Sequence, residues 1–289
     1  MIRRSFLKSL GTTLVSAVAL APQSLAQVFQ EQDRTAALTD GEQEAFLKRA
    51  DIVKTRSAPD GITASRRATL CDGVITHDAH IQTIDEYKTM YATVTGTEIN
   101  FSDTYKYNIA AYRLDRLLDL RMVPVSIERR VQGHPAAVTW WVDDVLMTEK
   151  QRWKQKVKPP DAESWARQTH LMRVFDELIF NIDRNLGNIL IKTGWSMQLI
   201  DHTRAFRCHK SLRNPKGLSR CDRKLFEALR TLNYADLERE MDPYVSKMQL
   251  DGLMARRDLL IDLFEDQVSK RSEGTVLYDH LALRHEKPS

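Results

Sequence analysis

The chain has 289 residues, of which 42% are hydrophobic and 28% are charged, so it can bury a core in one large or two small domains. This composition excludes a globally disordered chain. The formal net charge is only +4, and the three cysteines, Cys71, Cys208 and Cys221, lack the spacing of a zinc site. The sequence allows either a disulfide between Cys208 and Cys221 or buried free thiols.

Residues 1–26 are typical of a twin-arginine export signal. Arg3 and Arg4 precede the apolar run "GTTLVSAVAL", and residues 24–26 supply a small-x-small cleavage site. A membrane anchor is the alternative, but the run is interrupted and shorter than the roughly 20 residues of a span. We therefore expect the twin-arginine export machinery to carry a periplasmic or secreted protein.

Removal of this signal also removes most of the excess positive charge. Without Arg3, Arg4 and Lys8 the chain keeps 40 basic against 39 acidic residues. Such a balance gives no reason to expect nucleic acid as a partner. No later apolar run is long enough for a membrane span in the mature chain.

The next part of the chain favours an N-terminal extension followed by a small α+β lobe. Residues 27–60 form the extension, in which "GEQEAFLKRADIV" predicts one amphipathic helix. Asp72-Gly73 lies between strand-forming residues and predicts a hairpin, and residues 104–120 have the apolar spacing of a helix. "VPVSIERRV" and "AAVTWWVDDVLM", separated by Gly133, predict two more strands. We place this lobe at residues 61–148.

Residues 149–289 predict a larger, mostly helical lobe that contains one hairpin. The strongest helical stripe lies within "DAESWARQTHLMRVFDELIFNI", residues 161–182. "NILI" and "MQLID", separated by Thr193-Gly194, predict two strands. Beyond residue 222 the pattern is helical, and a long terminal helix includes residues 250–264.

Asp183, Asn188 and Asp201 surround this hairpin and are the candidate functional residues. The outer ends of a tight hairpin lie side by side, so Asn188 and Asp201 are expected at one edge, with Asp183 just before them. Oxygen ligands suit Mg²⁺, and a further carboxylate can accept the proton of an attacking hydroxyl. This arrangement fits phosphoryl transfer. A helix end that runs into a polar turn is the purely structural alternative.

"DRNLGN" and the downstream "LIDHTRAF" resemble the catalytic loop and the metal-binding aspartate of the kinase-like superfamily. The similar branches are atypical ones: the phosphatidylinositol kinases, the HipA-like kinases and the secretory-pathway (Fam20-type) kinases. "AAYRLDRLLDLRMVPVSIER" also resembles the segment in which an N-lobe helix of such kinases leads into a strand. The resemblance implies a two-lobe protein-kinase-like α+β fold, with a small β-rich N-lobe and a larger helical C-lobe.

The same resemblance implies a role for each matching residue. Asp183 becomes the catalytic base or a substrate-orienting carboxylate, and Asn188 and Asp201 become ligands of Mg²⁺ or Mn²⁺. Arg184 supports the loop. The segment "VTWWVDD", which contains Asp143, becomes the crossover that faces the adenine of ATP or another nucleotide. The acceptor is a hydroxyl-bearing protein, lipid or small molecule.

The sequence departs from the kinase pattern at two cofactor-binding positions. Kinases pair a strand lysine, which holds the α- and β-phosphates, with a glutamate of the N-lobe helix. Gln82 and Asn108 occupy the corresponding positions, and a hydrogen bond between their amides would replace the ion pair without replacing its positive charge. Another alignment gives the lysine role to Lys88 or Lys106. A glycine-rich loop is also missing; its only substitutes are Gly61, Thr63 and Ser65.

Two other groups of polar residues can be considered as binding sites. His77 and His80 lie on opposite faces of an expected strand, which argues against a shared metal. The basic stretch at residues 203–224 is either a solvated loop or a site for an acidic or phosphorylated group.

Three functions therefore follow from the sequence. The first is phosphate transfer from a nucleotide to a hydroxyl. An exported, noncatalytic pseudokinase that binds a ligand or partner is the second, favoured by Gln82 and Asn108. A nucleotidyl transferase that uses the same metal site is the third.

Overall fold

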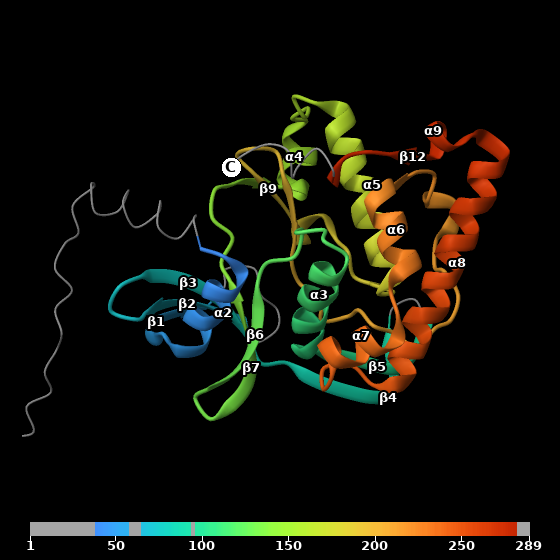
Figure 1. Ribbon diagram of the computed structural model, residues 1–289. Coiled ribbons are helices and arrows are strands. Elements are labelled where there is room, and N and C mark those ends of the chain that lie inside the picture. The colour runs from blue at the N-terminus through green and yellow to red at the C-terminus, as the bar shows by residue number, and fades with distance from the viewer. Residues whose placement is uncertain (1–37, 58–64, 94–95, 282–289) are drawn as a thin grey trace, which may run out of the picture. The chain divides into compact units, whose positions relative to one another are not determined.

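The computed structural model describes residues 38–57, 65–93 and 96–281, which form a β-rich N-lobe and a mostly helical C-lobe (Figure 1). The predicted α+β, two-lobe fold class is confirmed. The export signal, residues 27–37 of the extension, Gly61 and Thr63 lie outside the described residues.

The N-lobe is built on a five-stranded antiparallel sheet with the strand order β1-β2-β3-β7-β6. Its strands are β1 (Asp51–Ser57), β2 (Ser65–Cys71), β3 (Thr76–Gln82), β6 (Ser126–Val131) and β7 (His134–Trp140). The hairpin predicted at Gly73 is confirmed, with φ +88° at this residue. The strands predicted on either side of Gly133, which has φ +84°, pair as β6 and β7, but the second predicted strand ends at Trp140 and resumes as a separate strand at Val145. The expected lobe boundary at residue 61 falls between β1 and β2.

The two faces of this sheet have different neighbours because side chains alternate along each strand. Ala79 and Ile81 are buried on the face that helix α2 (Asp40–Arg49) covers, and His77 stacks on Trp140 there at 3.7 Å. His80 and Gln82 lie on the other face of β3. The two histidines are therefore on opposite faces, as the alternation predicts.

The helix expected within residues 41–53 ends early. α2 stops at Arg49, and β1 begins at Asp51 because its backbone pairs with β2. Arg129 reinforces this end of the helix by donating from Nη1 to the carbonyls of Leu47 and Ala50. A half-buried cation thus satisfies carbonyls that a helix end leaves without a donor.

Along the chain, β3 is followed by a hairpin, β4 (Asp85–Thr93) and β5 (Gly96–Thr104), and then by helix α3 (Lys106–Leu117). The sequence predicted α3 but not the hairpin. Tyr87 and Met90 are exposed on it, at 57% and 68%. An exposed ribbon lacks the apolar alternation that marks a half-buried strand.

The C-lobe contains a three-stranded sheet, eight helical segments and a short parallel strand pair among its described residues. In chain order they are β8 (Val145–Thr148), α4 (Glu149–Gln155), α5 (Ala162–Leu178), η1 (Leu186–Asn188), β9 (Ile189–Lys192), β10 (Met197–Leu199), η2 (Pro215–Gly217), β11 (Cys221–Asp222), α6 (Arg223–Thr231), α7 (Tyr234–Met241), α8 (Lys247–Arg271), α9 (Glu273–Val276) and β12 (Leu277–Tyr278). The predicted β9–β10 hairpin is confirmed.

Helix α5 and the hairpin are fixed to each other by one side chain. Gln168 donates to the carbonyl of Trp195 and accepts from the N–H of Met197. The hairpin is also tied to the N-lobe side, because the N–H of Leu199 donates to the carbonyl of Met122 at 2.7 Å. A continuous core of buried apolar side chains extends through both lobes.

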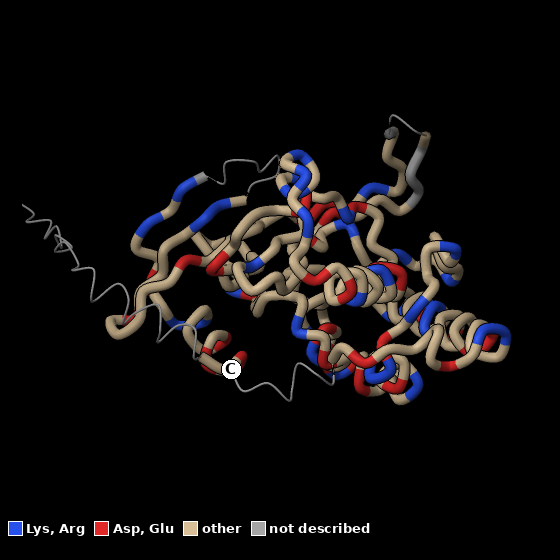
Figure 2. Tube along the Cα trace, turned by 90° about the horizontal axis from the view of Figure 1, so that it is seen from above, with Lys and Arg blue, Asp and Glu red and all other residues tan. Residues whose placement is uncertain are grey.

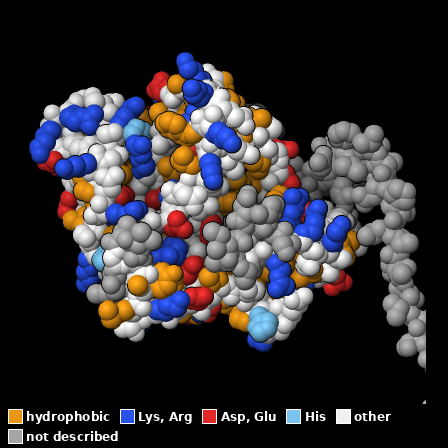
Figure 3. Space-filling model, turned by 180° about the vertical axis from the view of Figure 1, so that it is seen from behind, with side chains coloured by type: hydrophobic (Ala, Val, Ile, Leu, Met, Phe, Trp, Pro, Cys, Tyr) orange, Lys and Arg blue, Asp and Glu red, His pale blue; other side chains and the backbone are white. Residues whose placement is uncertain are grey.

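Basic and acidic residues are interspersed along the described chain (Figure 2), and on the face in Figure 3 Lys and Arg side chains lie among acidic and apolar ones. Cys71, Cys208 and Cys221 are free thiols. Among the described residues, every helix is too short or too polar to span a bilayer.

Arg256 of α8 is a fully buried cation that holds the segment after the hairpin in place. Its Nε donates to the carbonyl of Leu178, at the end of α5, and its Nη1 donates to the carbonyls of Arg207 and His209. Burial lowers the pKa of Arg256 to about 10, so the side chain remains protonated at neutral pH. Helix α8 thereby supports both the end of α5 and residues 207–209.

Replacing Arg256 with methionine should lower the free energy of unfolding by about 3 kcal/mol, because three buried carbonyls lose their donor. Urea unfolding, followed by tryptophan fluorescence, measures this change. Arg239→Met is the matched control, since Arg239 is exposed and pairs only with surface carboxylates. The control should change stability by less than about 0.5 kcal/mol, and equal losses would contradict the anchoring role.

Candidate functional site

The loop after α5 is organised by an ion pair between Arg184 and Asp176, whose side chains are 8% and 13% exposed. Nε of Arg184 lies 2.9 Å from Oδ2 of Asp176, and Nη2 donates to Oδ1 at 3.1 Å. The remaining donor, Nη1, reaches the carbonyls of Asn188 at 3.2 Å and Ile200 at 2.8 Å. One guanidinium therefore connects the helix to both outer ends of the hairpin, and the predicted supporting position of Arg184 is confirmed.

This bridge places Asn188 beside Asp201. The N–H of Ile200 donates to the carbonyl of Asn188 at 3.1 Å, and Asp201 follows directly. Asp201 has a positive φ of 56°, a conformation that is uncommon outside glycine and that concentrates at functional sites. Its Oδ1 accepts from the hydroxyl of Thr203 at 3.2 Å.

Asp183 lies on the same loop, on the exposed side. Its carbonyl accepts from Nδ2 of Asn188 at 3.4 Å, and its N–H donates to Oδ1 of Asn181 at 3.1 Å. Because Nδ2 of Asn188 is used in this way, its Oδ1 is left as an acceptor that can serve a cation. Asn188 is thus hydrogen-bonded to the backbone of Asp183 and to that of Ile200, the residue before Asp201.

The amides of Gln82 and Asn108 make the hydrogen bond that the sequence predicts. Nδ2 of Asn108 donates to Oε1 of Gln82 at 2.7 Å, and the two residues are only 7% and 2% exposed. Oδ1 of Asn108 also accepts from the N–H of His202 at 2.8 Å. The side chain of one α3 residue thus joins the end of β3 to the residue after Asp201.

The two lysines of the other alignment are engaged elsewhere. Nζ of Lys106 lies 3.1 Å from Oδ2 of Asp85, and Nζ of Lys88 lies 2.9 Å from Oε2 of Glu86. Both pairs belong to the β4–β5 hairpin and the start of α3. These contacts leave the buried position at the end of β3 to Gln82.

Asp143 lies in the connection between β7 and β8, as expected for the crossover. Its Oδ2 is 2.7 Å from Nε2 of His77, on the face of β3 opposite to His80 and Gln82. A nucleotide contact by Asp143 stays a prediction, with the carboxylate already engaged by His77.

Three further residues near Asp201 were missed by the sequence analysis. His80 shares a face of β3 with Gln82, and burial lowers its pKa while Asp201 acts in the opposite direction. Burial raises the pKa of Asp103, whose Oδ1 is buried and accepts no hydrogen bond within the described part of the chain. The hydroxyl of Thr203 also interacts with Asp103. The strand alternation could have revealed His80, which shares a face with Gln82. Asp103 could not be found in this way, because the hairpin that carries it was not predicted.

His202, next to Asp201, is a packing residue. It is 1% exposed and its ring meets Phe175 edge-on at 6.1 Å. Burial, followed by the charge of Arg184, holds the pKa of His202 well below its usual value. The neutral, buried ring of His202 therefore supports the loop by packing.

Part of the basic stretch at residues 203–224 serves the fold. Arg207 is buried and donates to Oγ of Ser102, and Nη1 of Arg213 donates to the carbonyl of Asn181. Lys210 and Lys216 are exposed.

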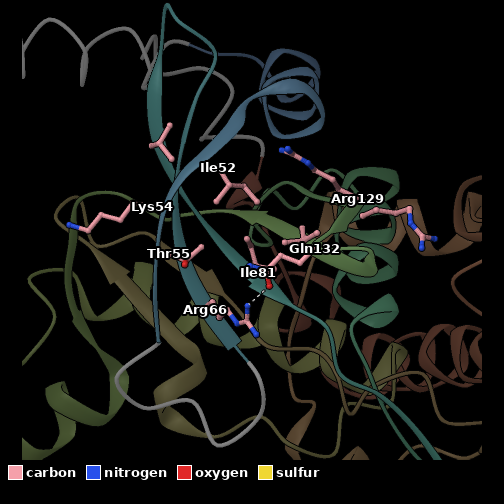
Figure 4. A pocket seen from close by; sticks show the side chains of 10 residues that line it. Ile52, Lys54, Thr55, Arg66, Ile81, Arg129 and Gln132 are labelled. Atoms are coloured by element: carbon pink, nitrogen blue, oxygen red, sulfur yellow. Dashed lines mark hydrogen bonds between the residues drawn. The ribbon is translucent and has the colours of Figure 1, made fainter. Parts of the chain in front are cut away.

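A cavity of about 390 Å³ lies on the other face of the N-lobe sheet (Figure 4). Ile81 contributes to its lining, as do Lys54, Arg66 and Gln132, and Arg66 donates to Oε1 of Gln132 at 3.0 Å. Since Ile81 and Gln82 point to opposite faces, this cavity is separate from the amide pair.

The residues present fit a divalent cation that has one protein carboxylate and one protein amide as ligands. Within residues 38–57, 65–93 and 96–281, no three His, Cys, Asp or Glu side chains cluster closely enough to hold a metal by themselves. Asn188 and Asp201 would therefore share the ion with water and the phosphates of a nucleotide, which is how Mg²⁺ is commonly bound.

Comparison with models of known protein families finds no match. The curated proteins likewise contain no similar sequence. Solved structures are similar in fold at low identity. A hydra Fam20 structure with sugar has a TM-score of 0.61 and 15% identity, covering 92% of this chain and 96% of its own. The Golgi casein kinase with Mn/ADP bound has a TM-score of 0.60 and 13% identity, covering 89% of this chain and 87% of its own.

These similarities cover 92% and 89% of the chain and therefore extend over both lobes. At such low identity the likeness concerns the fold alone. The chain therefore has the two-lobe fold seen in these two solved structures.

Proposed function

We propose that this chain is a metal- and nucleotide-dependent phosphotransferase, which moves phosphate from ATP or another nucleotide to a hydroxyl of an acceptor. The observation that carries the proposal is the bridge by Arg184, which fixes Asn188 and Asp201 side by side with Asp183 on the same loop. Positioning and electrostatics are the main contributions that a protein makes to phosphoryl transfer. The kinase-like fold supports the same reaction class.

Each residue would have a distinct role. Asn188 and Asp201 would hold Mg²⁺ or Mn²⁺, which supplies positive charge to the phosphate oxygens when it is bound. Asp183 is exposed and would orient the acceptor hydroxyl and take its proton. Arg184 and Asn108 would be positioning residues, since they hold the backbone on either side of Asp201.

A noncatalytic pseudokinase is the second candidate function. The observation that favours it is the neutral Gln82–Asn108 pair, which lacks the cation that kinases place on the α- and β-phosphates. Transfer of the nucleotidyl group is a variant of the first function, because the same metal ligands would serve it.

We also propose that the mature chain is periplasmic or secreted, on the basis of the twin-arginine pattern in residues 1–26. Lys210 and Lys216, together with other exposed cations of the basic stretch, would favour an acidic or phosphorylated acceptor.

Mg-ATP should raise the melting temperature of the mature chain by about 5 °C when it is present at about 100 times its dissociation constant. Asp201→Ala should lose this shift, because a metal ligand is removed. Asp262→Ala, an exposed change on α8, is the control and should keep it. Equal shifts for wild type and Asp201→Ala would contradict the metal assignment.

Asp183→Asn should slow phosphate transfer at least about 100-fold while Mg-ATP binding is retained, because an amide cannot accept the proton. ATP labelled at the γ or the α position, incubated with protein, sugar and lipid acceptors, measures the transferred group. Label only from the α position would indicate nucleotidyl transfer. Full activity of Asp183→Asn would remove the base assignment.

Replacing Arg3 and Arg4 together with lysine should retain the unprocessed chain in the cytoplasm of a bacterial host that has a twin-arginine system. Cell fractionation and intact mass measure the outcome. The wild-type chain should be exported and lose residues 1–26, as should the control Arg239→Lys. Export that is indifferent to both arginines would argue against this route.

A further inference from the structure

The hydrogen-bond pattern around Asn108 fixes the orientation of two amides. The backbone N–H of His202 can only donate, so the atom of Asn108 that faces it must be the oxygen, 2.8 Å away. The nitrogen of Asn108 therefore faces Gln82, which must present its Oε1 at 2.7 Å. Nε2 of Gln82 is turned away from Asn108, and its hydrogens have no acceptor among the described residues.

The charged groups near this amide are already paired. Lys106 is bonded to Asp85, and Arg67 of β2 has its Nε 2.6 Å from Oδ2 of Asp78. The Arg67 guanidinium also lies 4.1 Å from the centre of the Trp141 ring. Lys88 is paired with Glu86 on the exposed β4 ribbon.

No cation among the described residues hydrogen-bonds to the side chain of Gln82. His80, on the same face as Gln82, is disfavoured in its charged form by burial. Arg204 lies over the Phe101 ring at 4.4 Å and lowers the pKa of Asp103. At the position of the kinase lysine, this chain therefore offers a neutral donor.

From this arrangement we propose that Gln82 is a positioning residue for the phosphates of the nucleotide, and that it makes binding depend on the metal. This inference rests on the proposed function. Nε2 of Gln82 donates a hydrogen bond to a phosphate oxygen, while Asn108 holds the amide in that orientation. A neutral donor orients the phosphate but leaves its charge unbalanced, so the nucleotide binds only as its complex with a divalent cation.

The test is the affinity of the mature chain for ATP and ADP, measured by calorimetry in MgCl₂ and again in EDTA. Wild type should bind at least about 100-fold more weakly in EDTA, which corresponds to about 2.7 kcal/mol. Gln82→Lys supplies the missing cation and should tighten binding in EDTA at least about 10-fold. Its affinity in MgCl₂ should change much less.

Gln132→Lys is the matched control, because it adds the same charge on the β6–β7 turn, at the cavity on the other face of the sheet. It should leave the affinity in EDTA unchanged. The double variant Gln82→Lys/Asn108→Glu guards against misfolding of the single variant, since it installs a complete ion pair. Melting temperatures verify that each variant folds.

Equal affinity of wild type for ATP in MgCl₂ and in EDTA would overturn this inference alone. An equal effect of lysine at positions 82 and 132 would do the same, because the cation would then act at long range. Failure of wild type to bind either nucleotide in MgCl₂ would overturn the proposed function, and this inference with it.

Discussion

The candidate site depends on the buried guanidinium of Arg184. Its charge is balanced by Asp176 of α5, and its remaining donor is shared by the carbonyls of residues 188 and 200. A loop and a strand end that are separated along the chain are therefore held at a fixed distance from one helix. Removing one partner of such a largely buried pair leaves an uncompensated charge, which is far costlier than the loss of a surface ion pair.

A second constraint comes from neutral groups. Asn108 uses both ends of its amide, one toward β3 and one toward the backbone after Asp201. A charged pair in this position would connect the same elements and add a cation to the cleft. The amide connects them without that cation.

A second cation, Arg256, performs a related task for the end of α5. It satisfies carbonyls at the end of that helix and in residues 207–209, and no carboxylate makes an ion pair with it among the described residues. Arginine suits both positions because its planar group offers several donors in fixed directions and stays protonated when buried. Two buried arginines thus shape the backbone on either side of the loop that carries Asp183.

The sequence by itself determined the fold class, the β9–β10 hairpin and the proximity of Asn188 to Asp201, because strand alternation, helical periodicity and turn residues are local properties. It also identified Gln82 and Asn108 as partners. Tertiary structure alone decided that β1 replaces the end of a predicted helix, that an exposed hairpin carries Asp103 toward Asp201, and that Asp143 is engaged by His77. Those outcomes depend on contacts between residues far apart in the chain, and no local pattern encodes which distant group will satisfy a given carbonyl or carboxylate.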